Sequence, residues 1–259
     1  MATLQTAARI LGCFNSDQRE LTVTDAAGLL RIPKSKASRT MTAMLDAGLL
    51  ERNTESRAYR PGVLLHISGR IYREAHGLFD LADSVVGRIS KLTGHTGYVS
   101  RRDGDVVVGI SDHPGTHVLR VMSSVGRPLA AFASATGRAL LAVMPDDAIA
   151  RLYPGPLNPP SPSAPQSLDE LMARIATVRR LGYSESNDEA NRGVGALATT
   201  VASADGEALA LCIAFPAATV PAAEKRVIIE ALLKGAAEIN AMNNDDGVAG
   251  LLRVTGGAR

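Results

Sequence analysis

In the first third of the chain, apolar residues repeat every three or four positions, which is the spacing of an amphipathic helix. The first such set comprises Leu4, Ala7, Ala8, Leu11 and Phe14. After a short extended piece at Leu21–Val23, Thr24 or Asp25 can cap a second helix. The apolar face of this helix is predicted to consist of Ala26, Ala27, Leu29 and Leu30. The helix ends at Ile32-Pro33, because proline disfavours the helical conformation of the residue before it.

A third helix is predicted from Pro33 to about Ala47, because proline suits the first turn of a helix. Its inward face consists of Ala37, Met41, Met44 and Leu45. Its outer side is polar and cationic near the N-terminus, and the candidate DNA-binding residues there are Lys34, Ser35, Lys36, Ser38, Arg39 and Thr42. Two helices joined by a tight turn, the second with such a face, are typical of a helix-turn-helix that enters the major groove of DNA. In that setting Arg39 can make two hydrogen bonds to guanine.

Two strand-like pieces follow the third helix and predict a β-hairpin. They are Leu49–Arg52 and Ala58–Arg60, joined by residues 53–57. In a winged helix, such a hairpin holds backbone phosphates through its cationic residues. The candidates here are Arg52, Arg57 and Arg60. A three-helix module for protein contacts is the alternative, but the order, spacing and charge of the elements favour a DNA-binding winged helix.

The charge is distributed unevenly along the chain, although the 259 residues carry a formal net charge of only +2. Residues 31–60 contain seven cations and three anions, whereas residues 78–259 contain 17 cations and 19 anions. A basic segment is expected where a protein contacts phosphates. The small total charge excludes a protein that coats DNA indiscriminately.

Composition excludes several other classes of protein. Aromatic residues make up 3% of the chain and tryptophan is absent, which argues against a protein that stacks single-stranded bases. The apolar runs are far shorter than the roughly 18 residues of a membrane span, and the N-terminus lacks the features of a secretory signal. Two cysteines, Cys13 and Cys212, do not make a disulfide framework. We therefore expect a soluble, cytoplasmic protein without a membrane partner.

The rest of the chain alternates helical and extended patterns, which predicts an antiparallel sheet covered by helices in an α+β domain. A stripe of Val63, Leu64, Ile67 and Ile71 predicts a helix at 63–77, and a second helix follows from Leu78 to Leu92. The predicted strands are Tyr98–Arg101 and Val106–Ser111 around Asp103-Gly104, His117–Met122, and Val194–Ala202 and Glu207–Phe215 around Asp205-Gly206. The later predicted helices are Ser134–Met144, one from a Ser167/Glu170 capping box to Leu181, and one from Pro221 to about Met242.

Both halves contain motifs that resemble those of the IclR family of bacterial transcriptional regulators. In the first half these are Leu21–Ala27, Pro33–Arg39 and Leu45–Arg52. In the second half they are Gly126–Leu129, Ala133–Ala142 and the acidic pair Asp188-Glu189 shortly before Gly193. The resemblance implies a winged helix-turn-helix at 1–62, a linker helix at 63–77 that packs in the dimer, a GAF-like effector-binding domain at 78–242, and a flexible tail at 243–259.

Several residues depart from the family's pattern near its ligand pocket. Ala130-Ala131-Phe132 stands where Pro-Leu-His is frequent, and Arg138 stands where most members have lysine. Ala196 and Thr200 occupy positions where cysteine and proline are common. These departures bear on the identity of the ligand rather than on the fold.

The resemblance also implies which residues line the effector pocket. They are Val121, Leu129, Ala135, Thr136, Ser186, Val194, Cys212 and Ala214, with Asp188 of the acidic pair at the edge. Ordinary sheet core is the alternative interpretation of the apolar members. A helix capped near Ser134 or Thr136 would present backbone N–H groups that favour an anion such as a carboxylate.

Together these features predict a ligand-responsive regulator, with a repressor of a catabolic operon as the specific expectation. The expected partners are double-stranded operator DNA, a small organic acid, and further copies of the chain in a homodimer or dimer of dimers. An enzyme with an appended winged helix is one alternative, and a metal sensor using His113, His117 and Cys212 is another. The sequence has no nucleophile elbow, P-loop or complete dinucleotide fingerprint, so we expect no catalytic residues and no cofactor.

Overall fold

The computed structural model describes residues 3–15, 18–75, 77–118, 120–121, 128–203 and 206–255. The chain divides into two compact units, Met1–His76 and Gly77–Arg259. Each unit has its own hydrophobic core.

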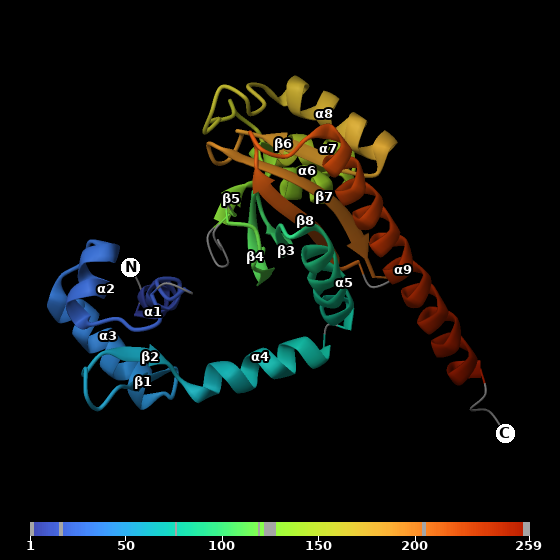
Figure 1. Cartoon of the computed structure of the whole chain (residues 1–259). Helices are drawn as coiled ribbons and strands as arrows, with labels where there is room; N and C mark the ends of the chain where they lie inside the picture. The colour runs from blue at the N-terminus through green and yellow to red at the C-terminus, as the bar shows by residue number, and fades with distance from the viewer. Residues whose placement is uncertain are drawn as a thin grey trace. The chain divides into compact units, whose positions relative to one another are not determined.

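The first unit contains three helices, a two-stranded hairpin and a further helix (Figure 1). In chain order these are α1 (Thr3–Leu11), α2 (Val23–Leu30), α3 (Lys34–Asp46), β1 (Leu50–Arg52), β2 (Tyr59–Pro61) and α4 (Val63–Ala75). The strands β1 and β2 pair in antiparallel fashion, as the sequence predicts for the wing. This order of elements is that of a winged helix-turn-helix.

Helix α2 begins earlier than its sequence pattern suggests. Thr22 is the N-cap, and its side chain accepts a hydrogen bond from the N–H of Asp25, while the Asp25 carboxylate accepts one from the N–H of Thr22. The prediction of Thr24 or Asp25 as the cap is therefore wrong, and the extended piece at 21–23 is reduced to a single bridge between Leu21 and Tyr59. The reciprocal capping box satisfies two backbone donors and so fixes where the helix starts.

The core of the first unit is built around Ile10, Leu21, Met41, Leu50 and Tyr59. The buried face of α1 consists of Thr6, Ala7 and Ile10, so the predicted face containing Leu4 and Ala8 is wrong. Leu4 is 80% exposed, and Leu29, predicted to face inward from α2, is 59% exposed. In a short helix, a single apolar residue can change which side the sequence pattern predicts to be apolar. The elements that pack against the helix decide which side is buried.

The second unit consists of a six-stranded antiparallel sheet with helices on both faces (Figure 1). Its strands are β3 (Thr96–Asp103), β4 (Val106–His113), β5 (Pro128–Ala130), β6 (Ser184–Asn187), β7 (Val194–Ala202) and β8 (Ala208–Pro216), in the order β5-β4-β3-β8-β7-β6. Its helices are α5 (Gly77–Thr93), the short 3₁₀ helix η1 (Ala131–Ala133), α6 (Ala135–Ala142), α7 (Asp146–Leu152), α8 (Leu168–Leu181) and α9 (Ala222–Thr255). The predicted α+β class, with a helix-turn-helix and a helix-covered antiparallel sheet, is confirmed.

Alternation along the strands gives the two faces of the sheet different side chains. On β8, Leu211, Ile213 and Phe215 face the large core shared with α5 and α9. Their neighbours Cys212 and Ala214 face the other side, where α6 packs against the sheet. One face is therefore filled by large apolar side chains, whereas the other carries small ones that leave space.

Several expected elements differ from those observed. The described residues of His117–Met122 contain no strand, and Val118 is fully exposed, while Met122 lies outside the described residues. The sheet instead takes the three-residue strand β5 as its edge. Helix α6 ends at Ala142, before its predicted end at Met144. Pro145 is the N-cap of α7, which is too short to show a periodic pattern. The strand β6 has the sequence Ser-Glu-Ser-Asn, which carries no apolar alternation.

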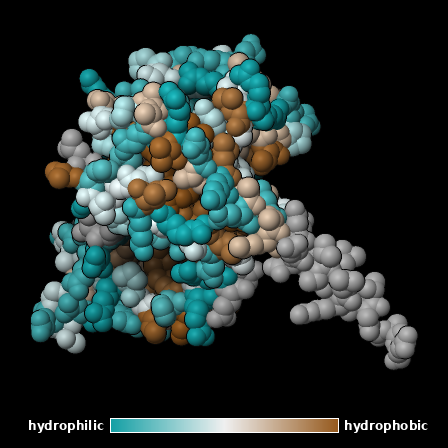
Figure 2. Space-filling view, turned by 45° about the vertical axis from the view of Figure 1, so that its right-hand side comes forward, coloured by the Kyte–Doolittle hydropathy of each residue, from teal (hydrophilic) through white to brown (hydrophobic). Residues whose placement is uncertain are grey.

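Helix α9 continues from Ala222 to Thr255 and so passes its predicted end near Met242. Asp205 of the predicted β7–β8 turn lies outside the described residues. Across the described part of the chain, none of the helices has the length and apolar character needed to cross a membrane. Figure 2 shows hydrophobic side chains reaching the surface in separate patches among hydrophilic ones.

Candidate functional site

Helix α3 presents a polar and cationic outer side to solvent. Lys34, Ser35, Arg39 and Thr42 are exposed, whereas Lys36 and Ser38 are half-buried at its edges. On the opposite side Ala37, Thr40, Met41 and Met44 are buried in the core of the first unit. The Arg39 Nε atom donates a hydrogen bond to the carbonyl oxygen of Ser35 at 3.3 Å, which holds the side chain along the outer surface of the helix.

A sharp turn between α2 and α3 directs this face outward. Arg31 has a left-handed backbone (φ 53°), and its N–H donates to the carbonyl oxygen of Gly28 at 3.3 Å. Pro33 then acts as the N-cap of α3. The chain therefore makes a tight turn between the two helices, as the helix-turn-helix interpretation requires.

The hairpin β1–β2 carries the other predicted cations. Arg52 and Arg57 are exposed and line a shallow surface hollow with Asn53 and Thr54. The Nε atom of Arg52 donates to the backbone carbonyl oxygen of Arg57 at 3.3 Å, which keeps the side chain of Arg52 beside the turn. Two arginines that line one hollow suit an anion of phosphate size.

Arg60 differs from the other two arginines because it already has an anionic partner. Its Nη2 atom lies 3.1 Å from Oε2 of Glu51, although both side chains are about half exposed. The second carboxylate oxygen of Glu51 accepts a hydrogen bond from the N–H of Val63 at 3.0 Å. Glu51 therefore ties the hairpin to the first turn of α4, and Arg60 would have to leave this pair to contact a phosphate.

Glu20 fixes the tip of the hairpin from outside it. Its carboxylate accepts hydrogen bonds from Asn53 Nδ2 at 2.8 Å and from Ser56 Oγ at 3.0 Å. These hydrogen bonds hold the pKa of Glu20 below its usual value. The loop between the strands is therefore ordered by a residue that lies more than thirty positions earlier.

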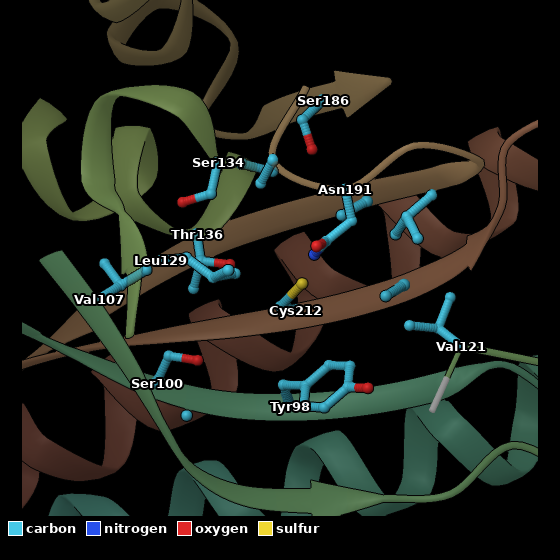
Figure 3. A pocket seen from close by; sticks show the side chains of 16 residues that line it. Tyr98, Ser100, Val107, Val121, Leu129, Ser134, Thr136, Ser186, Asn191 and Cys212 are labelled. Carbon is cyan, nitrogen blue, oxygen red and sulfur yellow. The ribbon is translucent and has the colours of Figure 1, made fainter. Parts of the chain in front are cut away.

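In the second unit, a cavity lies between the small-residue face of the sheet and helix α6. It contains about 640 Å³ of space between atoms, part of it open to solvent. Figure 3 shows side chains converging on this space from β3 and β8 below (Tyr98, Ser100, Cys212) and from α6 and the β6–β7 segment above (Ser134, Thr136, Ser186, Asn191).

Eight of the nine predicted effector-binding residues line this cavity. They are Val121, Leu129, Ala135, Thr136, Ser186, Val194, Cys212 and Ala214. Asp188 is not among the lining residues. It lies in the β6–β7 turn with a left-handed backbone (φ 56°), and its carboxylate accepts a hydrogen bond from the N–H of Gly193.

Eight further residues line the cavity that were not among the nine predicted effector-binding residues. They are Tyr98, Ser100, Val107, Gly109, Ser134, Ala190, Asn191 and Ala196. Tyr98 and Ser100 alternate with buried Val99 along the predicted strand β3, so strand periodicity was the available signal for them. No such signal exists for Asn191, which lies in an irregular turn.

Among the residues that the structure describes, the lining contains hydroxyl, amide and thiol groups but no charged side chain. Ser134 is the N-cap of α6, and its hydroxyl accepts a hydrogen bond from the N–H of Gly137 at 3.0 Å. Burial raises the pKa of the Cys212 thiol to about 12, although a hydrogen bond with Thr136 opposes this shift. Cys212 is therefore a neutral thiol at physiological pH and a poor nucleophile.

Directly behind the cavity wall, Arg138 and Glu189 form an ion pair that is almost fully buried. Nη1 and Nη2 of Arg138 lie 2.5 and 3.1 Å from the two oxygens of Glu189, and Nη2 also donates to the carbonyl oxygen of Glu185. Burial lowers the pKa of the Arg138 guanidinium, and Glu189 offsets part of this effect. Of the acidic pair, Asp188 thus belongs to a turn and Glu189 to a buried ion pair.

The residues of the alternative metal sensor do not come together among the described parts of the chain. His113 lies 3.0 Å from Asp83, and Cys212 lines the cavity. His117 instead lies near His95 and Glu224. A site made of His113, His117 and Cys212 is therefore not supported.

An exposed basic helix-turn-helix and a helix-covered sheet with a small-molecule cavity define a ligand-responsive, DNA-binding transcriptional regulator. Residues 3–54 match the IclR helix-turn-helix domain, and residues 71–241 match the model described as bacterial transcriptional regulator IclR C-terminal. The chain belongs to the IclR family of transcriptional regulators. Its members regulate transcription by binding DNA and are not enzymes, so the comparisons do not support the enzyme alternative.

Known relatives agree with this assignment. The regulator XynR of Escherichia coli is 27% identical over 200 residues, which cover 77% of this chain and 79% of XynR. The structure of an IclR transcriptional regulator from Alicyclobacillus acidocaldarius has a TM-score of 0.78 and 23% identity, covering 92% of this chain and 97% of that one. An IclR homologue from Microbacterium hydrocarbonoxydans, solved with 4-hydroxybenzoate, has a TM-score of 0.73 and 20% identity, covering 93% and 98%.

Proposed function

We propose that the first unit binds a specific operator through helix α3 and the β1–β2 hairpin. Arg39 reads a guanine, while Ser35 and Thr42 contact base edges or phosphates from the same side of the helix. Lys34, Lys36 and Ser38 flank them. In support, this side of α3 is polar and solvent-exposed, and it contains no acidic residue before Asp46.

The hairpin supplies phosphate contacts that set the position of α3 on the duplex. Arg52 and Arg57 are the principal contacts, because they lie side by side at the surface hollow. Arg60 contributes when it exchanges Glu51 for a phosphate. The resulting affinity depends steeply on salt concentration, because each neutralised phosphate releases counterions.

We infer that the effector is a small organic acid bound in the cavity of the second unit. The observation that carries this inference is the N-terminus of α6 within the cavity wall, where Ser134, Ala135 and Thr136 all line the space. The first N–H groups of a helix have no acceptor inside the helix and favour a carboxylate. Tyr98 and the small residues of the sheet leave a polarisable, largely apolar space for the rest of the ligand. The homologue solved with 4-hydroxybenzoate makes an aromatic acid the first compound to test.

The regulator acts as a homodimer, or as a dimer of dimers, on a palindromic operator. Helix α4 supports this assembly, because Val63, Leu64, Ile67 and Ile71 are 41–60% exposed along it. An exposed apolar stripe of this kind is typical of a surface that meets another chain.

We propose that the protein represses a catabolic operon in the cytoplasm. We also propose that Asp188 acts as a turn residue at the edge of the pocket rather than as a ligand.

The test combines DNA binding and ligand binding on the full-length protein. Fluorescence anisotropy with the region upstream of its own gene is measured against a scrambled fragment of equal length, between 50 and 200 mM salt. 4-Hydroxybenzoate and short aliphatic acids are then screened by thermal unfolding, with methyl esters as uncharged controls. We expect an acid, but not its ester, to stabilise the protein. We also expect that acid to change the affinity for DNA by about 5- to 150-fold.

A variant that fills the cavity separates the two activities. Ala214→Leu projects a larger side chain into the space from β8 and is expected to abolish the response to the acid while DNA binding persists. Ala202→Leu, at the exposed end of β7, is the matched control and is expected to respond normally. Equal affinity for the upstream and scrambled fragments at low salt would refute operator binding. A full response from the cavity-filling variant would refute the proposed pocket.

A further inference from the structure

We propose that Arg31, in the turn between α2 and α3, is an additional residue of the first unit that binds a phosphate of the DNA backbone. This role rests on the proposed function, because it requires α3 to enter the major groove. Arg31 is the C-cap of α2 and lies three residues before Lys34, where α3 begins. In a helix-turn-helix the N-terminal residues of the second helix contact base edges, so the turn that precedes them lies close to the duplex.

The backbone of Arg31 has a conformation that favours glycine. Its φ is 53° and its ψ is 50°, which is the left-handed helical region. This conformation closes the C-terminus of α2, because the N–H of Arg31 donates to the carbonyl oxygen of Gly28 at 3.3 Å and the N–H of Ile32 to that of Ala27 at 3.1 Å. Glycine is the usual residue at such a helix end, since a Cβ atom is disfavoured there. An arginine with this backbone strain is therefore a reason to look for a function of its side chain.

The side chain of Arg31 makes no interaction that would offset this strain. It is exposed to solvent, and no residue in the described part of the chain forms a hydrogen bond or an ion pair with its guanidinium. Between Asp25 and Asp46 the sequence contains four cations and no acidic residue. The guanidinium of Arg31 is therefore available to an anion from outside the chain, and its geometry suits a phosphate.

The other left-handed residues support this interpretation. Besides glycines and Arg31, the described parts of the chain contain two residues with positive φ, Arg57 and Asp188. Aspartate tolerates this conformation, and the Asp188 carboxylate accepts a hydrogen bond from the N–H of Gly193. Arg57 is an exposed arginine in the loop of the β1–β2 hairpin, where we propose that it binds a phosphate. Arg31 thus shares both its backbone conformation and its exposed cationic side chain with a proposed phosphate contact.

The spacing of Arg31 and Arg57 fits the two sides of a major groove. Glu20, which lies just before α2, accepts hydrogen bonds from Asn53 and Ser56 in the loop of the hairpin. The hairpin loop is therefore near the start of α2, whereas Arg31 lies at its end. The eight residues of α2 span about 12 Å, which is close to the roughly 12 Å width of the major groove. The two arginines accordingly contact phosphates on opposite sides of the groove that α3 enters.

The test is the substitution Arg31→Gly in the full-length protein, because it removes the guanidinium and retains the backbone conformation. We expect this variant to unfold at a temperature no lower than that of the parent. We also expect about 3- to 10-fold weaker binding to operator and scrambled DNA alike at about 100 mM salt, with a salt slope smaller by about 1. Arg31→Asn should behave in the same way, because asparagine also tolerates the left-handed conformation. Arg31→Lys should retain most of the affinity, because a phosphate also binds a point charge.

Lys91→Ala on α5 is the control for the loss of one exposed positive charge and is expected to bind DNA like the parent. Parental affinity and salt slope in both neutral variants, while the parent prefers its own upstream region, would overturn the role of Arg31 and leave operator binding intact. A parent protein that binds upstream and scrambled DNA equally would instead overturn operator binding, and the role of Arg31 with it.

Discussion

The guanidinium of Arg138 on helix α6 donates hydrogen bonds from both of its terminal nitrogens to the carboxylate of Glu189 in the β6–β7 turn. Arg174 of helix α8 approaches the same carboxylate at 3.1 Å. Ala190 and Asn191, the next two residues of the turn, line the effector cavity. The buried pair therefore fixes one wall of the cavity to the helix that forms another.

Replacing Glu189 with alanine is expected to destabilise the second unit strongly. The change leaves the Arg138 guanidinium buried without its carboxylate, and breaking a buried pair in this way costs about 3–5 kcal/mol. Equilibrium unfolding in urea would measure the loss. Glu185→Ala is the matched control, because Glu185 pairs with Lys225 at a half-exposed position and such pairs contribute about 0–1 kcal/mol. Equal losses in the two variants would contradict the proposed importance of the buried pair.

Gly137 is expected not to tolerate a larger side chain, although it lies within helix α6. A Cβ atom at this position would lie 2.1 Å from the carbonyl oxygen of Ala131 and 2.3 Å from its Cα atom. Alanine normally stabilises a helix relative to glycine by roughly 1 kcal/mol, but here the backbone of η1 must move. We expect Gly137→Ala to lower stability by about 1–3 kcal/mol, the usual cost of overpacking.

Thermal unfolding of Gly137→Ala alongside Gly155→Ala provides the comparison. A Cβ atom at Gly155 meets nothing within 4 Å, so this control is expected to unfold at the parental temperature. A Gly137→Ala variant as stable as the parent would show that α6 and η1 can separate at little cost.

Arg39→Ala is expected to weaken binding to the operator by about 1–3 kcal/mol and to relax specificity at one base pair. Arg52→Ala should instead weaken binding to all sequences alike and reduce the salt dependence, since its expected partner is a phosphate. Lys91→Ala, an exposed change on α5, serves as the control for loss of one positive charge. Competition assays with single-base operator variants distinguish these outcomes. Unchanged base preference in Arg39→Ala would contradict its assigned role.

The capping box of α2 is expected to make part of the stability of the first unit dependent on pH. Hydrogen bonds from Thr22 lower the pKa of Asp25 in the folded state. A carboxyl group with a lowered folded pKa stabilises the protein above its unfolded pKa of about 3.9, and this contribution is lost as the pH falls below that value. Because Asp25 is largely exposed to solvent, the effect is below about 1 kcal/mol.

Asp25→Asn should therefore unfold at a lower temperature than the parent at pH 7, and the difference should shrink near pH 3. Asp46→Asn provides the control, because Asp46 lies at the end of α3, where a helix does not favour a carboxylate. A difference between Asp25→Asn and the parent that grows on acidification would have the wrong sign for this mechanism.

Periodicity predicted the long elements of the fold, because they bury one face against a core. The inward face of α3 with Ala37, Met41 and Met44 is such a case. Prediction from periodicity failed where contacts with distant parts of the chain outweigh the local sequence pattern. The β6 strand is polar, and pairing with β7 rather than its own residues makes it a strand. Leu29 is apolar yet exposed, because Ala26 and Ala27 form the side of α2 that packs against the core.

The cavity residues likewise include some that the local sequence pattern predicts and some that it does not. Most were located by resemblance to a family, because their spacing along the chain reveals nothing of which distant residues meet. Tyr98 followed the period of its strand and was open to prediction. Asn191 lines the cavity from a turn that Glu189 ties to Arg138, a contact between residues 51 positions apart. His95 and Glu224 are in contact although they are 129 positions apart in the sequence, and no local pattern predicts this contact.

The tight contact between Gly137 and Ala131 has a consequence for how this regulator can acquire new ligands. No residue larger than glycine fits at that point of α6 unless η1 moves, so we expect this part of the helix to vary little. Variation in ligand size must come from the opposite side, where Ala196, Cys212 and Ala214 are small residues on paired strands. Substitutions that arise in evolution or in laboratory selection for a different inducer should therefore accumulate at these three positions. A substitution there changes the volume of the cavity without adding a buried charge.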